Sequence, residues 1–389
     1  TQVGLVRFLA CADQEDESKI IGASWVLSVA FIAVVYLLGY GTLLFNRKIL
    51  DSSFGILFVW YPLLSVATLP LSLGAAILQA KKMFLEILYI RLISSGSFML
   101  LVLANVFFFG LGVKSIVIMY IGANLFASLF TLFANYSGIQ YFFKTTADNI
   151  RELFQFGKYS MGTLLGSNLL RMFSIFMIGF FMSEDAVAIY SVPLQIYTGF
   201  NMVLNGFSAV AFPSLSRMSR EKDHSKMVEV FYQYASCTLL LFIPVVISGF
   251  ILTRPLIWIM GGEKYIETAL STNILKMFLL ACLLLPIDRY LGDILDGINR
   301  PKYNFIKVSF MLVFSIVGNL IALFYCKSLL GVSAIMVISI FAGIIAGYIA
   351  LKREGYDIKF MDIYRCGKQI IAKFFTSAQV MLKKEYINR

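Results

Sequence analysis

Long apolar segments recur along this chain, and they constrain its fold more than any other feature. Each is about 18 residues or longer, which is enough for a helix to cross the roughly 30 Å hydrocarbon core of a membrane. The segments are continuously apolar rather than alternating, which excludes a transmembrane β-barrel. Only 14% of the residues are charged, against about 25% in soluble domains. The sequence therefore predicts an all-α, polytopic helical membrane protein.

Ten spans are predicted, separated mostly by short connections that contain Gly, Pro, Asn or charged residues. They are expected at residues 20–45, 54–78, 84–109, 115–139, 156–182, 187–215, 228–252, 268–296, 304–326 and 330–351. Most connecting Lys and Arg residues fall at the two ends of the chain and in the connections after even-numbered spans. Because basic residues mark the cytoplasmic side, both visible ends are predicted to be cytoplasmic.

The chain contains a weak internal repeat. Residues 1–20 resemble residues 208–227, since each is a helix end followed by a charged loop that closes on Ser-Lys and an apolar residue. Further along, ILQAKK (77–82) resembles ILDGIN (294–299). Matches in the same order indicate a parallel repeat, which is typical of transporters built from two similar halves. We therefore expect two bundles of six helices, with ten spans present here and two more before Thr1.

This repeat sets the predicted domains. Residues 1–147 form a partial N-terminal bundle with four spans, residues 148–355 a C-terminal six-helix bundle, and residues 356–389 a basic tail. Apolar and basic residues of the tail fall on different faces of a helix, which predicts an amphipathic helix on the inner leaflet. A partner-binding helix is the alternative.

An arginine near the middle of the fifth span is the strongest functional signal. Thr163, Ser167, Arg171 and Ser174 share one helical face. Arg171 is too deep to reach either interface easily, and a charge facing lipid there costs about 2.5–3.5 kcal/mol or more. Guanidinium binds phosphate in a bidentate manner, so we interpret Arg171 as an anion-binding residue. The alternative is a structural pair with an intramembrane carboxylate such as Asp288.

Other intramembrane polar residues allow two interpretations each. Asn201 and Asn205 either line a wet cavity or join helices by hydrogen bonds. Arg91 lies nearer the cytoplasmic headgroups, so it either faces a cavity or extends to the interface.

The eighth span carries Pro286, Asp288 and Arg289 in its inner half. Gating or ion coupling by Asp288 and Pro286 is one interpretation of this segment. A structural pair of Arg289 with Asp293 is the other.

No enzymatic motif is present: the sequence lacks GxSxG, a P-loop and HExxH. The chain has a single histidine, His224, so a histidine-based metal site is not expected. The protein is therefore not predicted to be an enzyme, and no cofactor, metal or nucleic acid is expected.

Several segments resemble the polysaccharide-export branch of the MOP superfamily, the Wzx-type flippases. They are VRFLACADQEDESKI (6–20), ILQAKK (77–82), FGKYSMGTLLGSNLL (156–170), IGFFMS (178–183), AIYSVPLQI (188–196) and FPSLSRM (212–218). The resemblance implies alternating-access transfer of an undecaprenyl-diphosphate-linked oligosaccharide, such as an O-antigen, capsule or exopolysaccharide unit, across a bacterial cytoplasmic membrane. Many members have an aspartate where Ser174 stands here, so ion coupling at that position is in doubt.

This interpretation assigns roles to the polar residues. Arg171, Arg91 and Arg289 are expected to hold the diphosphate, and Ser167, Asn168, Gln195, Asn201 and Asn205 to line the cavity and meet the glycan. Expected partners are membrane lipids and the polysaccharide polymerase machinery, and a coupling ion, H⁺ or Na⁺, is left open. The alternatives are a cation-coupled multidrug exporter of the same superfamily and a membrane glycan polymerase or ligase.

Overall fold

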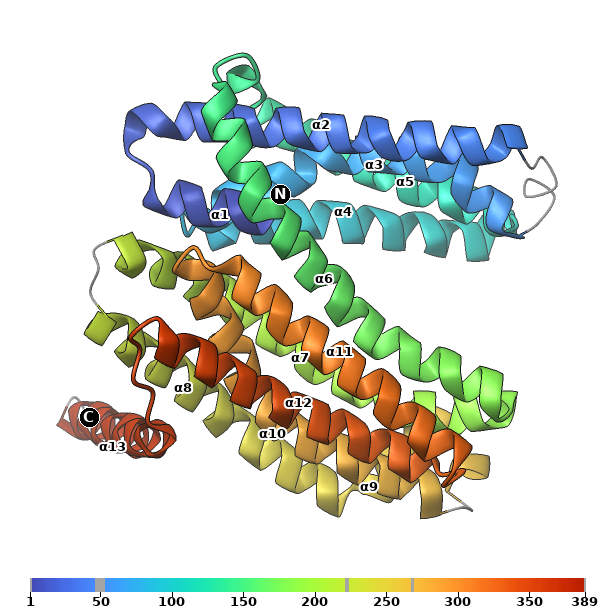
Figure 1. Ribbon diagram of the computed structural model, residues 1–389, viewed down its shortest axis with the longest axis vertical. Coiled ribbons are helices and arrows are strands. Elements are labelled where there is room, and N and C mark those ends of the chain that lie inside the picture. The colour runs from blue at the N-terminus through green and yellow to red at the C-terminus, as the bar shows by residue number, and fades with distance from the viewer. Residues whose placement is uncertain (1, 46–52, 221–223, 267–268, 388–389) are drawn as a thin grey trace. The chain divides into compact units, whose positions relative to one another are not determined.

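The computed structural model describes residues 2–45, 53–220, 224–266 and 269–387. These residues form helices joined by short connections, without a strand among them (Figure 1). Ten helices in this part of the chain are long and apolar enough to cross a membrane, at positions that match the ten predicted spans. The predicted all-α, multi-pass architecture is therefore confirmed.

The chain divides into two compact units, residues 1–158 and residues 159–389. The division falls inside one long helix, α6 (Ala147–Phe181). It places the basic tail with the second unit. The predicted boundary between residues 147 and 148 stays a prediction.

The first unit is organised around α3, which packs against α1, α2, α4 and α5. Its helices are α1 (Gln2–Cys11), α2 (Gln14–Phe45), α3 (Ser53–Ala80), α4 (Phe84–Ala104), α5 (Val113–Phe133) and the start of α6. Buried hydroxyls link neighbouring helices: Ser94 donates to the amide oxygen of Asn124 at 3.0 Å. Such bonds satisfy polar atoms where water is absent.

The second unit is organised around α10, which packs against α7, α8, α11 and α12. Its further helices are α7 (Glu184–Arg220), α8 (His224–Ile251), α9 (Thr253–Gly261), α10 (Ala269–Gly297), α11 (Pro301–Phe324), α12 (Leu329–Arg353) and α13 (Phe360–Ile387). Neighbours on several sides bury much of α10, and apolar residues such as Phe278 and Leu291 are fully buried. A buried polar side chain on α10 therefore needs a partner within the protein.

The ends of α3 and α10 have the same backbone geometry. Lys82 follows α3 with a φ of 60° and Asn299 follows α10 with a φ of 63°. The next backbone N–H closes each turn at 2.9 Å, from Met83 to Leu78 in the first unit and from Arg300 to Leu295 in the second. These turns are the segments that resemble each other in sequence. The central helices of the two units are thus equivalent, as a parallel repeat requires.

A second pair of helix ends agrees. Positive φ values occur at Asn135 after α5 and at Gly355 after α12. The N–H groups of Tyr136 and Tyr356 donate to carbonyls five residues earlier, both at 3.0 Å. α3 to α5 of the first unit therefore correspond in order to α10 to α12 of the second.

Two glycines of α12 allow it to approach the polar residues of α10 and α11. A Cβ at Gly343 would lie 2.8 Å from a carboxylate oxygen of Asp288, and a Cβ at Gly347 would lie 3.3 Å from Lys307 Cδ. The Gly-x-x-x-Gly spacing, which by itself indicates only close helix packing, here makes room for an ion pair.

Gly343→Ala is expected to destabilise the protein by about 1–3 kcal/mol, because the added methyl group overpacks a filled interior. Thermal unfolding in detergent measures the effect. The control is Gly96→Ala on α4, where nothing lies within 4 Å of the new Cβ. If both variants unfold at the wild-type temperature, the packing argument for Gly343 is wrong.

Candidate functional site

Five charged residues gather where α10 meets α11, and we call them the charge cluster. They are Asp288, Arg289, Asp293 and Asp296 on α10 and Lys307 on α11. Both helices are among the candidate membrane spans. A charge within a membrane span needs a charged or hydrogen-bonding partner, and a carboxylate without one is neutralised by a proton. The contacts of each side chain therefore determine whether it carries a charge.

Lys307 forms the most buried ion pair of the described residues. Its ammonium group donates at 2.8 Å to the Asp288 carboxylate and at 2.9 Å to the Asp288 backbone carbonyl. The Lys307 side chain is 3% exposed and that of Asp288 is 18% exposed. Asp288 therefore pairs with Lys307, and the alternative pairing with Arg171 is not formed.

The span expected at residues 304–326 includes Lys307, but this residue was given no role in the predicted site. Helix α11 begins at Pro301, and proline is favoured in the first turn of a helix. That start puts Lys307 almost two turns inside the helix, on the side that packs against α10. Pro301 was the available signal for this residue.

Arg289 pairs with Asp293, as the spacing of four residues allowed. The Arg289 Nε lies 3.4 Å from one Asp293 oxygen and donates to Ser208 of α7 at 3.1 Å. Ser208 in turn donates to the other Asp293 oxygen at 2.5 Å. The Arg289 side chain remains 48% exposed, so it can still contact a ligand.

The Asp296 carboxylate has fewer polar contacts than those of Asp288 and Asp293. One carboxylate oxygen accepts a hydrogen bond from the Asn304 amide at 2.9 Å. The other is buried and has no hydrogen-bond partner among the described residues. Neither Asp296 nor Asn304 was predicted as a site residue.

Arg171 lies on α6 and is half-buried. Its guanidinium donates to the side-chain oxygen of Asn168 at 2.6 Å, one helical turn away. Arg171 therefore has an amide partner and free donors, which is a suitable arrangement for receiving an anion.

Ser174, on the same face of α6, has a structural contact. It is buried and accepts a hydrogen bond from Asn319 of α11 at 2.9 Å. This contact joins α6 to α11, so the predicted polar face of α6 is divided between packing at Ser174 and an exposed position at Ser167.

The predicted residues of α7 differ in their surroundings. Asn201 donates to the backbone carbonyl of Tyr197 at 3.0 Å, whereas Gln195 and Asn205 are exposed. In the first unit, Arg91 of α4 is exposed, and the described residues place no carboxylate within ion-pair distance of it. Pro286 is buried inside α10, which continues through it.

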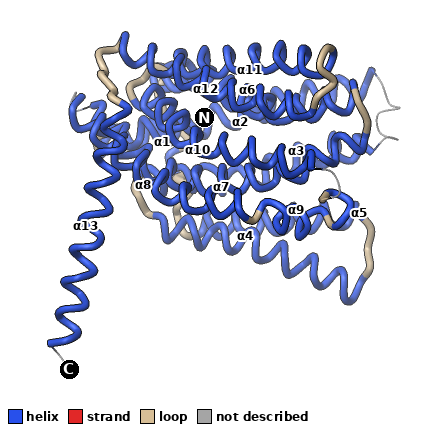
Figure 2. The backbone as a smooth tube through the Cα atoms, turned by 90° about the horizontal axis from the view of Figure 1, so that it is seen from below, coloured by secondary structure: helices blue, strands red, loops and turns tan. Residues whose placement is uncertain are grey.

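The basic tail forms α13, and its first turns dock on α8. Ser236 donates to the backbone carbonyl of Ile363 at 2.6 Å, and the Lys359 N–H donates to Tyr232 at 2.8 Å. From this attachment α13 runs at a large angle to the spans of its unit (Figure 2).

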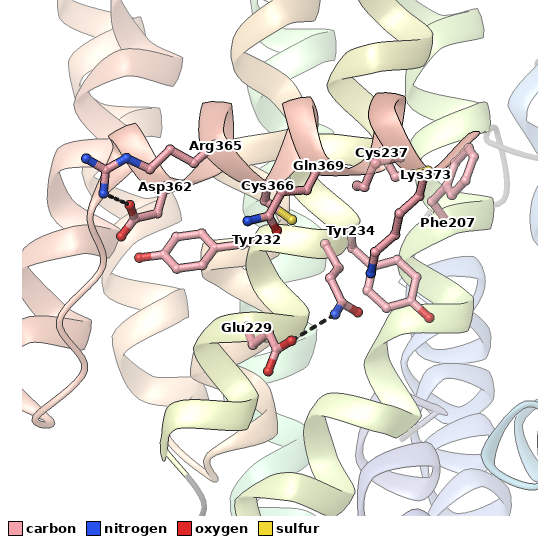
Figure 3. Close-up of a pocket in the computed structure, with 12 residues that line it drawn as sticks. Phe207, Glu229, Tyr232, Tyr234, Cys237, Asp362, Arg365, Cys366, Gln369 and Lys373 are labelled. Atoms are coloured by element: carbon pink, nitrogen blue, oxygen red, sulfur yellow. Dashed lines mark hydrogen bonds and ion pairs between the residues drawn. The ribbon is translucent and has the colours of Figure 1, made fainter. Parts of the chain in front are cut away.

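A pocket of about 730 Å³ lies between α8 and α13. Figure 3 shows Lys373 turned into it toward Tyr234, whereas Arg365 turns toward Asp362, its partner at 3.0 Å.

Comparison with known families decides the identity. Residues 2–270 match a family described as polysaccharide biosynthesis protein, and residues 218–388 match a second family of the same description. This chain belongs to the polysaccharide biosynthesis protein family. The predicted resemblance to the polysaccharide exporters of the MOP superfamily is confirmed.

A curated relative of this family member is a probable low-salt glycan biosynthesis flippase of Haloferax volcanii, 20% identical over 158 residues. The aligned part covers 41% of the present chain and 33% of that relative. The matched families and relatives are transporters and flippases rather than enzymes.

Solved structures agree on the fold. The structure of a MATE transporter in complex with MaL6 superposes with a TM-score of 0.78 at 16% identity, covering 94% of this chain and 84% of that one. A MOP superfamily transporter from Pyrococcus furiosus, whose reverse binding-pocket polarity suggests a different function, superposes with a TM-score of 0.76 at 15% identity. It covers 91% of this chain and 83% of that one.

Proposed function

We propose that this protein is a flippase that moves an undecaprenyl-diphosphate-linked oligosaccharide from the inner to the outer leaflet by alternating access. The observation that carries the proposal is Arg171, a half-buried guanidinium within an apolar span that is bonded only to the neutral side chain of Asn168 in the described residues. An arginine held without a carboxylate keeps its charge available for an anionic ligand. The diphosphate is such a ligand, and its lipid tail can stay in the bilayer during transfer.

The remaining polar residues have supporting roles in this proposal. The exposed part of Arg289 provides further positive charge for the diphosphate in the second unit, and the role of Arg91 in the first unit stays a prediction. Ser167, Asn168, Gln195, Asn201 and Asn205 provide hydroxyl and amide groups for the glycan.

We place the protein in a bacterial cytoplasmic membrane with both ends on the cytoplasmic side, because the basic connections lie there. In this orientation α13 lies along the inner leaflet, where anionic lipids attract its basic residues. The large angle between α13 and the spans of its unit (Figure 2) and the docking of α13 on α8 support this placement. The polysaccharide polymerase machinery is the expected protein partner.

A cation-coupled multidrug exporter is the second candidate, and the fold shared with MATE transporters favours it. An exporter of organic cations needs an accessible intramembrane carboxylate. Asp288 and Asp293 are instead engaged by Lys307 and Arg289, and Asp296 is buried. The distribution of charge therefore favours an anionic substrate.

The test is translocation in proteoliposomes. A fluorescent undecaprenyl-diphosphate oligosaccharide is placed in one leaflet, and its appearance in the other is followed by quenching. We expect protein-dependent transfer of this lipid and none of an organic cation. Efflux of organic cations without lipid transfer would contradict the proposal and favour the multidrug alternative.

A further inference from the structure

The charge cluster contains one more carboxylate than it has cations. The Lys307 ammonium group forms an ion pair with the Asp288 carboxylate at 2.8 Å. The Arg289 Nε lies 3.4 Å from the Asp293 carboxylate. Asp296 is the third carboxylate, and its one hydrogen-bond partner among the described residues is the Asn304 amide. If all five side chains were ionised, the buried cluster would carry an uncompensated negative charge.

The surroundings of Asp296 disfavour that charge. The residue is 8% exposed, and one of its oxygens has no hydrogen-bond partner in the part of the chain that the structure describes. Asp296 is also next to the last residue of α10, at the negative end of the helix dipole. An ionised carboxylate buried without a full set of partners costs several kcal/mol, which protonation avoids.

The charged groups that act on Asp296 are Asp293 and Arg289 from its own helix and Lys307 from α11. From α7, the backbone of Leu215 and Ser216 approaches the end of α10 at Gly297 and adds no titratable group. On α12, Gly347 faces Lys307 and Leu291 and is also uncharged. Both nearby cations already have carboxylate partners, so among the described residues no cation forms an ion pair with Asp296.

A proton fits this position better than a metal cation. A hard cation such as Ca²⁺ takes about 6–8 oxygen ligands, whereas Asp296 has a single unengaged oxygen. No group of three or more metal-binding side chains occurs among the described residues. A protonated carboxyl is neutral and needs only one acceptor for its hydrogen.

We propose that Asp296 is a proton-binding site that controls the contact between α10 and α11. With the proton on the unpartnered oxygen, the carboxyl is neutral and stays packed against Asn304. When the proton leaves, the carboxylate requires water, and the α10–α11 contact at this end of the helices opens. This inference rests on the proposed transport function for its role in the cycle, with the proton as the coupling ion, but proton binding itself can be measured without a substrate.

The first test is infrared spectroscopy of the purified wild-type protein and of Asp296→Asn. The wild type is expected to show a protonated-carboxyl band at neutral pH that shifts in D₂O, and Asp296→Asn to lack one carboxyl's share of it. The matched control is Asp185→Asn, which removes an exposed carboxylate paired with Lys264 at 3.1 Å and leaves the band unchanged. Identical bands in wild type and Asp296→Asn from about pH 5 to pH 8 would overturn the proposal.

The second test is the pH dependence of lipid transfer in the proteoliposome assay. Wild-type transfer is expected to change at least several-fold across this pH range, and transfer by Asp296→Asn to be flat. Asparagine mimics the neutral carboxyl, so the variant should fold; Asp296→Glu, which restores a titratable group, serves as the second variant. Transfer that requires Na⁺ and ignores pH in the wild type would overturn the proposal. Absence of any lipid transfer would refute the flippase function, while the infrared result still decides the proton site.

Discussion

Lys307→Met is expected to destabilise the protein by about 3–5 kcal/mol, the usual cost of leaving a buried charge without its partner. The Lys307 side chain is 3% exposed. Its ammonium group donates to the carboxylate and to the backbone carbonyl of Asp288. Methionine keeps the length and apolar volume of lysine, so the variant removes the charge without creating a large cavity. The measurement is thermal or denaturant unfolding in detergent, with wild type alongside.

The matched control is the double variant Lys307→Met with Asp288→Leu. Removing both members of a buried pair also removes the desolvation cost, so the double variant is expected to recover most of the lost stability. Arg300→Met gives a second comparison, because Arg300 pairs with Glu354 at 3.0 Å but is 56% exposed. Its loss is expected to cost no more than about 1 kcal/mol. A single Lys307→Met variant as stable as wild type would show that the pair is not buried as described.

Arg171→Ala is expected to reduce lipid translocation by about 10-fold to 100-fold. A hydrogen bond to a charged group contributes about 1.5–3 kcal/mol, and about 1.4 kcal/mol corresponds to a tenfold change. Arg171→Lys keeps the charge but loses the planar fork that binds two phosphate oxygens, so an intermediate rate is expected. The measurement is the initial rate of leaflet transfer at matched protein-to-lipid ratios.

The control for Arg171 is Arg254→Ala on the short helix α9, an exposed arginine with no proposed role in substrate binding. Its transfer rate should equal that of wild type. Asn168→Ala removes the amide that holds Arg171 at 2.6 Å, and a smaller loss than for Arg171→Ala is expected. Wild-type transfer rates in both Arg171→Ala and Arg171→Lys would show that this arginine does not bind the diphosphate.

The sequence by itself determined the membrane-spanning architecture of this protein. Segments such as Leu329–Arg353 are apolar over their whole length, and such segments can satisfy their backbone polar groups in lipid only as helices. The repeat was also visible in the sequence, as the similarity of ILQAKK to ILDGIN. In the structure, each of these segments ends a central helix in a left-handed turn. The pairing of Arg289 with Asp293 followed from their spacing on one helix.

Only the tertiary structure decided which charges are compensated. Asp288 and Lys307 lie on different helices, and their contact depends on the rotation and depth of α11 against α10. Sequence periodicity shows which residues share a face of one helix, but it does not show which face of the next helix meets it. For the same reason Asn304 and the unpartnered oxygen of Asp296 could not be predicted. Local spacing determines the helices of this protein, whereas the packing between helices determines which of its buried charges has no partner.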